Sequence, residues 1–396
     1  MSKGKKKSQA SKPKDTPNSD ERRTEEDIRN DEQEVAHFRD IQYSFLDYAS
    51  FMLLELRRRQ HAYDILEDKY KQYIPQDVWN AKQMEFKNCI LANARFLANV
   101  VKTHNYYTEM FGIPTQPRDY LSAPYQMSKV KSTLHQLIRD WSDEGKEERE
   151  LCYTPLLKRL EHYIPLVRNE DGSISPENQR RVLVPGTGLS RLLLEVVERG
   201  YAGQGNEFSY QMLLVSNYML NHVSEAYSIP IYPWTDNPNN VFATGDNNRC
   251  ILIPDVVPRV CVHEGADFSM CAGEFLESYS DQENAWDCVL TCFFIDTAPV
   301  IIEYITVIHK ILKPGGYWIN LGPLLYHWQS TEDITAEEMD ERYGQSLELS
   351  FEEIQDIMKK VGFRILEVER FCSPYTDNIR SMMTTLFRGV LFVAQK

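Results

Sequence analysis

The chain has 396 residues, of which 42% are hydrophobic, and its formal net charge is −14. This apolar content suffices for a sizeable core and excludes a disordered protein, while the length fits two domains or one domain with a large extension. The negative charge argues against a general nucleic-acid-binding protein, which needs a basic surface. No apolar run approaches the roughly 20 residues of a membrane-spanning helix, so no membrane contact is predicted.

Residues 1–30 are polar and charged, and they predict a disordered tail. The tail has six lysines by position 14, followed by an acidic stretch. Two interpretations of the lysines stay open, a nuclear-import signal and a merely solvated segment. The eight cysteines, without a secretory leader, are typical of reduced thiols, which predicts a cytosolic protein with the nucleus as a second location. Cys288 and Cys292 lack a second pair at metal-binding spacing, so no metal is predicted.

Residues 31–165 lack strand alternation and predict a helical extension. Its first helix carries an apolar stripe at three- and four-residue spacing, formed by Phe38, Ile41, Phe45, Tyr48 and Met52. Further helical patterns cover 77–111 and 126–141. The pattern leaves open whether the extension covers a cofactor, forms a homodimer, or does both.

Residues 166–396 alternate strands with helices, which predicts a Rossmann-like α/β fold with a mostly parallel sheet. Strands are expected at 181–186, 201–208, 259–268, 286–296 and 317–328, the last including the loop that follows. The continuous apolar run of the fourth strand suits a central position covered on both faces. Helices are expected from Leu189 to Arg199 and over 209–223, 297–312 and 351–363.

Two further segments complete the expected domain. Residues 228–258 are rich in proline and predict an irregular insertion across one face. The last two strands, 363–371 and 386–396, are predicted to form an antiparallel hairpin at the sheet edge.

The first strand runs into Pro185-Gly186-Thr187-Gly188 before the helix begins. Gly186 and Gly188 have no Cβ, so the backbone can turn sharply and approach a ligand. A strand, a turn and a helix in this order direct N–H groups at a ligand above the strand end, as in nucleotide-cofactor folds. Glu207 lies 21 residues after Gly186, where a ribose-binding carboxylate belongs. The alternative for Glu207 is a surface carboxylate.

Two acid–aromatic pairs end strand-like runs, Asp267-Phe268 and Glu274-Phe275. The acid of such a pair can accept from an adenine amino group while the ring packs on the base. One pair is expected to be structural, and Asp267-Phe268 is preferred for adenine. Arg191 stands where a dinucleotide-binding turn has its third glycine, which, with the LKPGGYWI turn, favours an S-adenosylmethionine enzyme over a dehydrogenase.

Asp296 and His327 end the fourth-strand and fifth-strand segments, at the edge where open α/β sheets bind ligands. A buried acid is costly without a partner, which favours a functional role for Asp296 over the alternative of a helix N-cap. The expected proximity of Asp296 favours a functional role for His327 as well.

Four segments together resemble the carnosine N-methyltransferase family: VLVPGTGLSRL, QGNEFS, WDCVLTCFFIDTA and LKPGGYWINLGPLLYHW. The resemblance runs from about residue 40 to the end. It implies a class I methyltransferase fold with a helical N-terminal extension. It also implies transfer of a methyl group from S-adenosylmethionine to an imidazole nitrogen of carnosine, giving anserine.

The resemblance also implies roles for individual residues. Cofactor contacts are implied for Gln136, Arg139, Gly186, Glu207, Asp267 and Phe268. Substrate contacts are implied for Asp296 and His327. Phe387 stands where the family has a substrate-contacting tyrosine, so a hydroxyl hydrogen bond worth about 0.5–1.5 kcal/mol would be missing.

Imidazole attacks only through a nitrogen with a free lone pair, and its reference pKa of about 6.5 leaves it mostly neutral at pH 7. We expect Asp296 to accept the N–H of the non-reacting nitrogen and thereby fix the tautomer, while His327 holds the substrate's polar end or carries a proton away. Three alternatives stay open: methylation of a histidine in a protein or peptide, a nicotinamide-dependent oxidoreductase, and a non-catalytic binding module.

Overall fold

The computed structural model describes residues 25–103, 120–170, 172–328 and 343–396. Most of the predicted tail therefore lies outside the described residues. Its last part, from Glu25 onward, already belongs to helix α1 (Glu25–Leu46), so helix begins before the predicted boundary at residue 31.

The centre of the molecule is a seven-stranded sheet in the order β5-β2-β1-β6-β7-β9-β8. Its strands are β1 (Arg181–Pro185), β2 (Ala202–Glu207), β5 (Phe268–Ala272), β6 (Trp286–Cys292), β7 (Leu312–Gly322), β8 (Arg364–Pro374) and β9 (Leu386–Gln395). The first five in the order run parallel, and β9 is antiparallel to both β7 and β8. The predicted fold class, including the antiparallel final strand, is confirmed.

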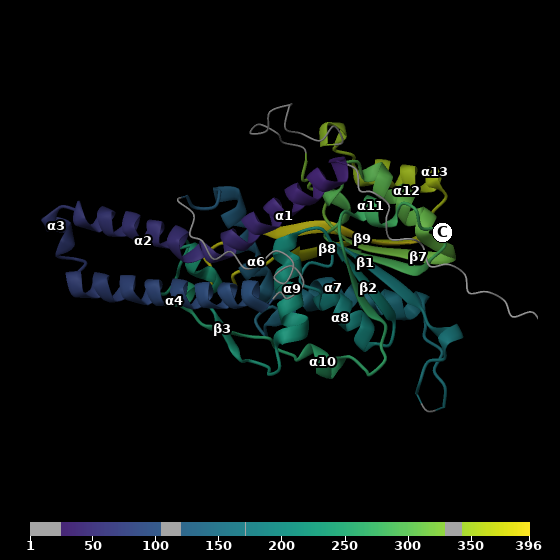
Figure 1. Cartoon of the computed structure of the whole chain (residues 1–396), viewed down its shortest axis with the longest axis horizontal. Coiled ribbons are helices and arrows are strands. Elements are labelled where there is room, and N and C mark those ends of the chain that lie inside the picture. Colours follow the sequence, from purple (N-terminus) through teal and green to yellow (C-terminus); the bar gives the residue numbers. More distant parts are fainter. Residues whose placement is uncertain (1–24, 104–119, 171, 329–342) are drawn as a thin grey trace, which may run out of the picture.

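Helices cover both faces of this sheet (Figure 1). One face carries α7 (Lys146–Tyr163) and α8 (Arg191–Glu198), and the other carries α11 (Phe275–Tyr279), α12 (Ile301–Ile311) and α13 (Phe351–Val361). Along β1, Val182 and Val184 join the first cluster and Leu183 the second, as strand alternation requires. Helix α7 lies within the predicted extension but packs on the sheet.

The strand predicted over 259–268 is wrong. Pro258 opens the short helix α10 (Pro258–Cys261), and the strand begins only at Phe268. Proline lacks an N–H and has a fixed φ, which suits the first turn of a helix and not a sheet interior. Gly265, with φ of +81°, then lies in the turn that leads into β5.

The remaining helices form a second layer beside the sheet. They are α2 (Tyr48–Asp64), α3 (Asp68–Lys71), α4 (Gln76–Thr103), α6 (Pro124–Trp141) and α9 (Tyr210–His222). Figure 1 shows α2 and α4 side by side as a hairpin that projects away from the sheet. The predicted apolar stripe is confirmed, because all five of its side chains are buried. Residues 104–111 of the predicted second helix lie outside the described residues.

The proline-rich insertion is more regular than predicted. It contains the antiparallel pair β3 (Ile229–Ile231) and β4 (Ile251–Ile253), separated by two short 3-10 turns. Asn93 of α4 fastens it, because the side-chain amide both donates to and accepts from the backbone of Tyr232, each at 2.8 Å. The insertion therefore connects the helical layer to the sheet domain. Across the described ranges, no helix combines the length and apolarity that crossing a bilayer would require.

Candidate active site

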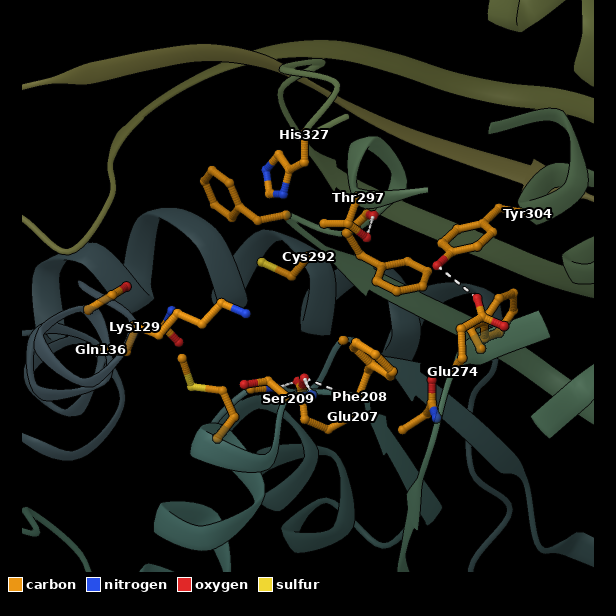
Figure 2. Close-up of a pocket in the computed structure, with 18 of the residues that line it drawn as sticks. Lys129, Gln136, Glu207, Phe208, Ser209, Glu274, Cys292, Thr297, Tyr304 and His327 are labelled. Atoms are coloured by element: carbon orange, nitrogen blue, oxygen red, sulfur yellow. Dashed lines mark hydrogen bonds between the residues drawn. The ribbon is translucent and has the colours of Figure 1, made fainter. Parts of the chain in front are cut away.

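A cavity of about 460 Å³ opens at the carboxyl ends of β1, β2 and β6 (Figure 2). The order of the sheet reverses between β1 and β6, and such reversals are where open α/β sheets bind ligands. One face of α6, the glycine turn after β1, and the segments after β2, β5, β6, β7 and β8 form its walls. Residues 228–258 contribute none of the described lining, so the insertion does not cover the groove there.

The glycine turn forms the floor of the cavity. Gly186 and Gly188 have φ of +62° and +56°, in the left-handed region that favours glycine. A Cβ on Gly186 would lie 2.5 Å from Cδ2 of Phe294, so this close approach of β1 to the segment after β6 requires glycine. The Gly188 N–H, which we expected to face a ligand, instead donates to Glu207 at 2.8 Å.

Glu207 ends β2 and lines the cavity, where its carboxylate is held by the backbone. It accepts N–H groups from Gly188 and Ser209, each at 2.8 Å, and from Phe208 at 3.0 Å. Burial raises the pKa of the Glu207 carboxyl, and these three hydrogen bonds oppose the rise. Because a carboxylate has about four acceptor positions, one remains for a further donor.

The preference between the two acid–aromatic pairs is wrong. Glu274 and Phe275 line the cavity, whereas Asp267 and Phe268 stand at the amino end of β5, on the opposite edge of the parallel sheet. Phe268 lines a separate surface groove instead. The strand predicted over 259–268 would have placed this pair at its carboxyl end, but β5 begins only at Phe268, so the pair stands at the amino end instead.

Helix α6 brings Gln136 and Arg139 to the cavity, as the resemblance implied. The Arg139 guanidinium donates to both carboxylate oxygens of Asp140, at 2.8 and 3.2 Å. The same carboxylate accepts the Tyr153 hydroxyl at 2.6 Å, so the arginine is held in one orientation. Gln136 lies next to the glycine turn, since a Cβ on Gly188 would meet its Oε1 at 3.5 Å.

Asp296 lies beneath the cavity wall and not on it. It is 2% exposed, and the described lining includes its neighbour Thr297 and His327 but not Asp296 itself. Its Oδ2 accepts the backbone N–H of Leu325 at 2.8 Å, and its carbonyl accepts that of His327 at 3.1 Å. Burial raises the pKa of the Asp296 carboxyl, opposed by the Leu325 N–H and by His327. The side chain therefore fixes the segment that presents His327, a correction to the expected direct exposure.

The N-cap alternative for Asp296 is also wrong, because α12 begins at Ile301 after Val300. The nearby helical turn that contains Asp296 is a short 3-10 turn, Ile295–Thr297. The carboxylate caps no helix, and it instead accepts a backbone hydrogen bond from the loop after β7.

Phe387 does not line the cavity, which corrects its expected substrate contact. Its ring lies behind the wall, edge-on to Phe293 and Tyr375 at centroid distances of 6.0 and 6.2 Å. Tyr375, which we did not predict, lines the cavity, and its hydroxyl accepts from Gln136 at 3.4 Å. Two successive antiparallel pairings make β8 run in the direction of β7, so the residue after β8 reaches the same edge.

Sequence reasoning also missed Lys129 and Ser132. With Gln136 and Arg139 they recur every three or four residues along α6, and all four line the cavity. That spacing was visible in the sequence and could have found them once Gln136 was implicated.

A sheet in this order, with a glycine turn after its first strand and a carboxylate ending the second, defines a class I S-adenosylmethionine-dependent methyltransferase. The comparisons with known proteins agree with this class. The family described as carnosine N-methyltransferase matches residues 117–396, and the chain belongs to that family.

Relatives that carry the same name align over most of the chain. Carnosine N-methyltransferase of Mus musculus is 39% identical over 92% of this chain and 86% of its own length. The Schizosaccharomyces pombe protein is 34% identical over 92% of this chain and 97% of its own length. Among solved structures, phosphoethanolamine N-methyltransferase 2 of Haemonchus contortus aligns with a TM-score of 0.37 at 18% identity, covering 66% of this chain and 47% of that one.

Proposed function

We propose that this protein transfers the methyl group of S-adenosylmethionine to an imidazole nitrogen of carnosine or a related histidine-containing dipeptide, giving an anserine-type product. The observation that carries the proposal is a single cavity that joins the glycine turn and Glu207 to the His327 segment. The relatives named above support carnosine as the acceptor.

The residues present fit the methyl donor. The turn at Gly186 is a cradle that a Cβ would fill, and Glu207 keeps one acceptor position for a hydroxyl. Glu274 and Phe275 offer an acid and a ring at the neighbouring strand end, and we assign them the adenine contact. Arg139 and Gln136 lie near the turn, where they would hold the donor's polar end. The bound donor supplies an electrophilic methyl group on a sulfonium.

The chain's own residues orient the acceptor. Asp296 holds the backbone of Leu325 and His327 by two hydrogen bonds, which fixes the place from which the His327 side chain reaches the cavity. The cavity beside it is lined by aromatic side chains that include Phe293 and Tyr375. An apolar wall disfavours a charged imidazolium and so favours the neutral ring, whose free lone pair is the nucleophile. Alignment at close range supplies most of the remaining catalysis.

The function is tested by incubating the purified protein with labelled S-adenosylmethionine and three acceptors: carnosine, homocarnosine and a histidine-containing peptide. We expect methylated carnosine, identified by mass spectrometry of the imidazole. Label on the peptide alone, or on none of the three, would contradict the proposal.

Replacing Glu207 by glutamine is expected to raise the Kd for S-adenosylmethionine about 10- to 100-fold, the range of one or two charge-assisted hydrogen bonds. The amide would direct its NH₂ at one of the backbone N–H groups that the carboxylate now accepts. Isothermal calorimetry measures the affinity, and Glu277→Gln is the control because that carboxylate does not line the cavity. Equal affinities of wild type and Glu207→Gln would refute the role.

We also propose a cytosolic location, with nuclear import through the lysines before residue 15. Microscopy of the tagged chain with and without those residues tests this.

A homodimer is proposed through the α2–α4 hairpin, whose tip exposes Ile65, Tyr73 and Val78. Light scattering after gel filtration would show a monomer if this is wrong.

A further inference from the structure

Among the charged side chains that line the cavity, most are committed to partners within the protein. Glu207 is held by three backbone N–H groups, and Glu274 accepts the N–H of Glu277 at 2.9 Å. Arg139 is paired with Asp140. These groups therefore have fixed positions, and their charges are already balanced or hydrogen-bonded.

Lys129 differs from them. Its ammonium makes no hydrogen bond or ion pair within the part of the chain that the structure describes, although the residue lines the cavity. Figure 2 shows the side chain extending from α6 into the cavity. An unpaired cation at the wall of a binding cavity is a ready partner for an anionic group of a ligand.

The position of Lys129 along α6 separates it from the turn that cradles the donor. The end of α6 lies against the turn, because the Trp141 indole N–H donates to the carbonyl of Leu189 at 3.1 Å. At 1.5 Å per residue, Lys129 is about 18 Å along the helix from Trp141 and about 10 Å from Gln136. Gln136 and Arg139 therefore lie at the end of the cavity near the turn, and Lys129 lies toward its other end.

We propose that Lys129 binds the α-carboxylate of the dipeptide acceptor and makes the enzyme selective for acceptors that carry a free carboxylate. The inference rests on the proposed function. Carnosine, whose histidine is C-terminal, has its only anionic group on the residue that bears the imidazole. When the imidazole is held beside His327, the carboxylate needs a cation at the cavity wall, and Lys129 supplies it.

The experiment compares two acceptors, carnosine and β-alanylhistamine, which has the same imidazole and amine but no carboxylate. In Lys129→Met we expect the KM for carnosine to rise about 10-fold or more, the worth of a charge-assisted hydrogen bond. The KM for β-alanylhistamine and the Kd for S-adenosylmethionine should not change. Lys129→Arg should recover most of the affinity for carnosine.

Lys131→Met is the matched control. Lys131 lies on the same helix, but its ammonium lies over the Phe51 ring at 5.4 Å and does not line the cavity, so no change in either KM is expected. An unchanged KM for carnosine in Lys129→Met, equal rises for both acceptors, or weaker donor binding would overturn the assignment. If wild type methylates neither acceptor, the proposed function itself fails.

Discussion

Replacing Asp296 by alanine is expected to lower kcat for carnosine at least about 100-fold, equivalent to roughly 3 kcal/mol of transition-state stabilisation. The buried carboxylate holds the Leu325 N–H, and its loss leaves that donor without a partner in the wall. The backbone carbonyl at position 296 would still accept the His327 N–H, but the loop at Leu325 would lose its side-chain anchor, so the acceptor ring beside it would be less well aligned. Steady-state kinetics with saturating donor measures the effect.

Asparagine at the same position separates geometry from charge. Asp296→Asn keeps an oxygen that can accept the Leu325 N–H but removes the negative charge near His327. We expect it to recover about tenfold of the activity lost in Asp296→Ala. Donor affinity should stay unchanged in both variants, because Asp296 does not line the cavity. Near-normal turnover of Asp296→Ala would exclude any role of this carboxylate in catalysis.

The parallel strands of the fold were predictable because their signal is local. A strand covered on both faces needs a largely apolar run, and residues 288–295 supply one that only Thr291 interrupts. The predicted third strand failed where the local signal was ambiguous. Val260 and Val262 alternate as in a strand, yet Pro258 and Gly265 place a helical turn and a bend there. The conformational preferences of proline and glycine outweigh the strand-like alternation of the two valines.

The residues of the site show the same difference between local signals, which the sequence reveals, and contacts between distant segments, which it does not. Gly186 and Glu207 follow from one strand–turn–helix unit, and both line the cavity. Tyr375 depends on the direction of β8, which two antiparallel pairings set and no local pattern reveals. The partner of Asp296 is the N–H of Leu325, in a different strand's loop. The sequence predicted that Asp296 would be important, but whether it faces the ligand or the backbone depends on a contact distant along the chain.

Replacing Gly186 by alanine is expected to raise the Kd for S-adenosylmethionine at least about 100-fold. The added methyl group would lie 2.5 Å from the Phe294 ring, which itself packs against Phe275 and Tyr304 and has little room to retreat. The φ of +62° adds about 1–2 kcal/mol of backbone strain for a residue with a Cβ. We therefore expect the turn or the Phe294 wall to shift, and donor binding by calorimetry reports it.

Substitutions at two other glycines distinguish the steric clash at Gly186 from the backbone strain of a positive φ. Gly265 has φ of +81°, and nothing lies within 4 Å of a Cβ placed there. Gly265→Ala should therefore lower the free energy of unfolding only by the cost of backbone strain, and donor binding should not change. Gly188→Ala would meet only Gln136 Oε1, at an ordinary 3.5 Å, and should weaken the donor less than Gly186→Ala. If all three variants bind the donor equally well, the close approach of β1 to Phe294 does not shape the donor site. A graded loss in the order Gly265, Gly188, Gly186 would instead assign the effect to that contact, because backbone strain is common to all three positions.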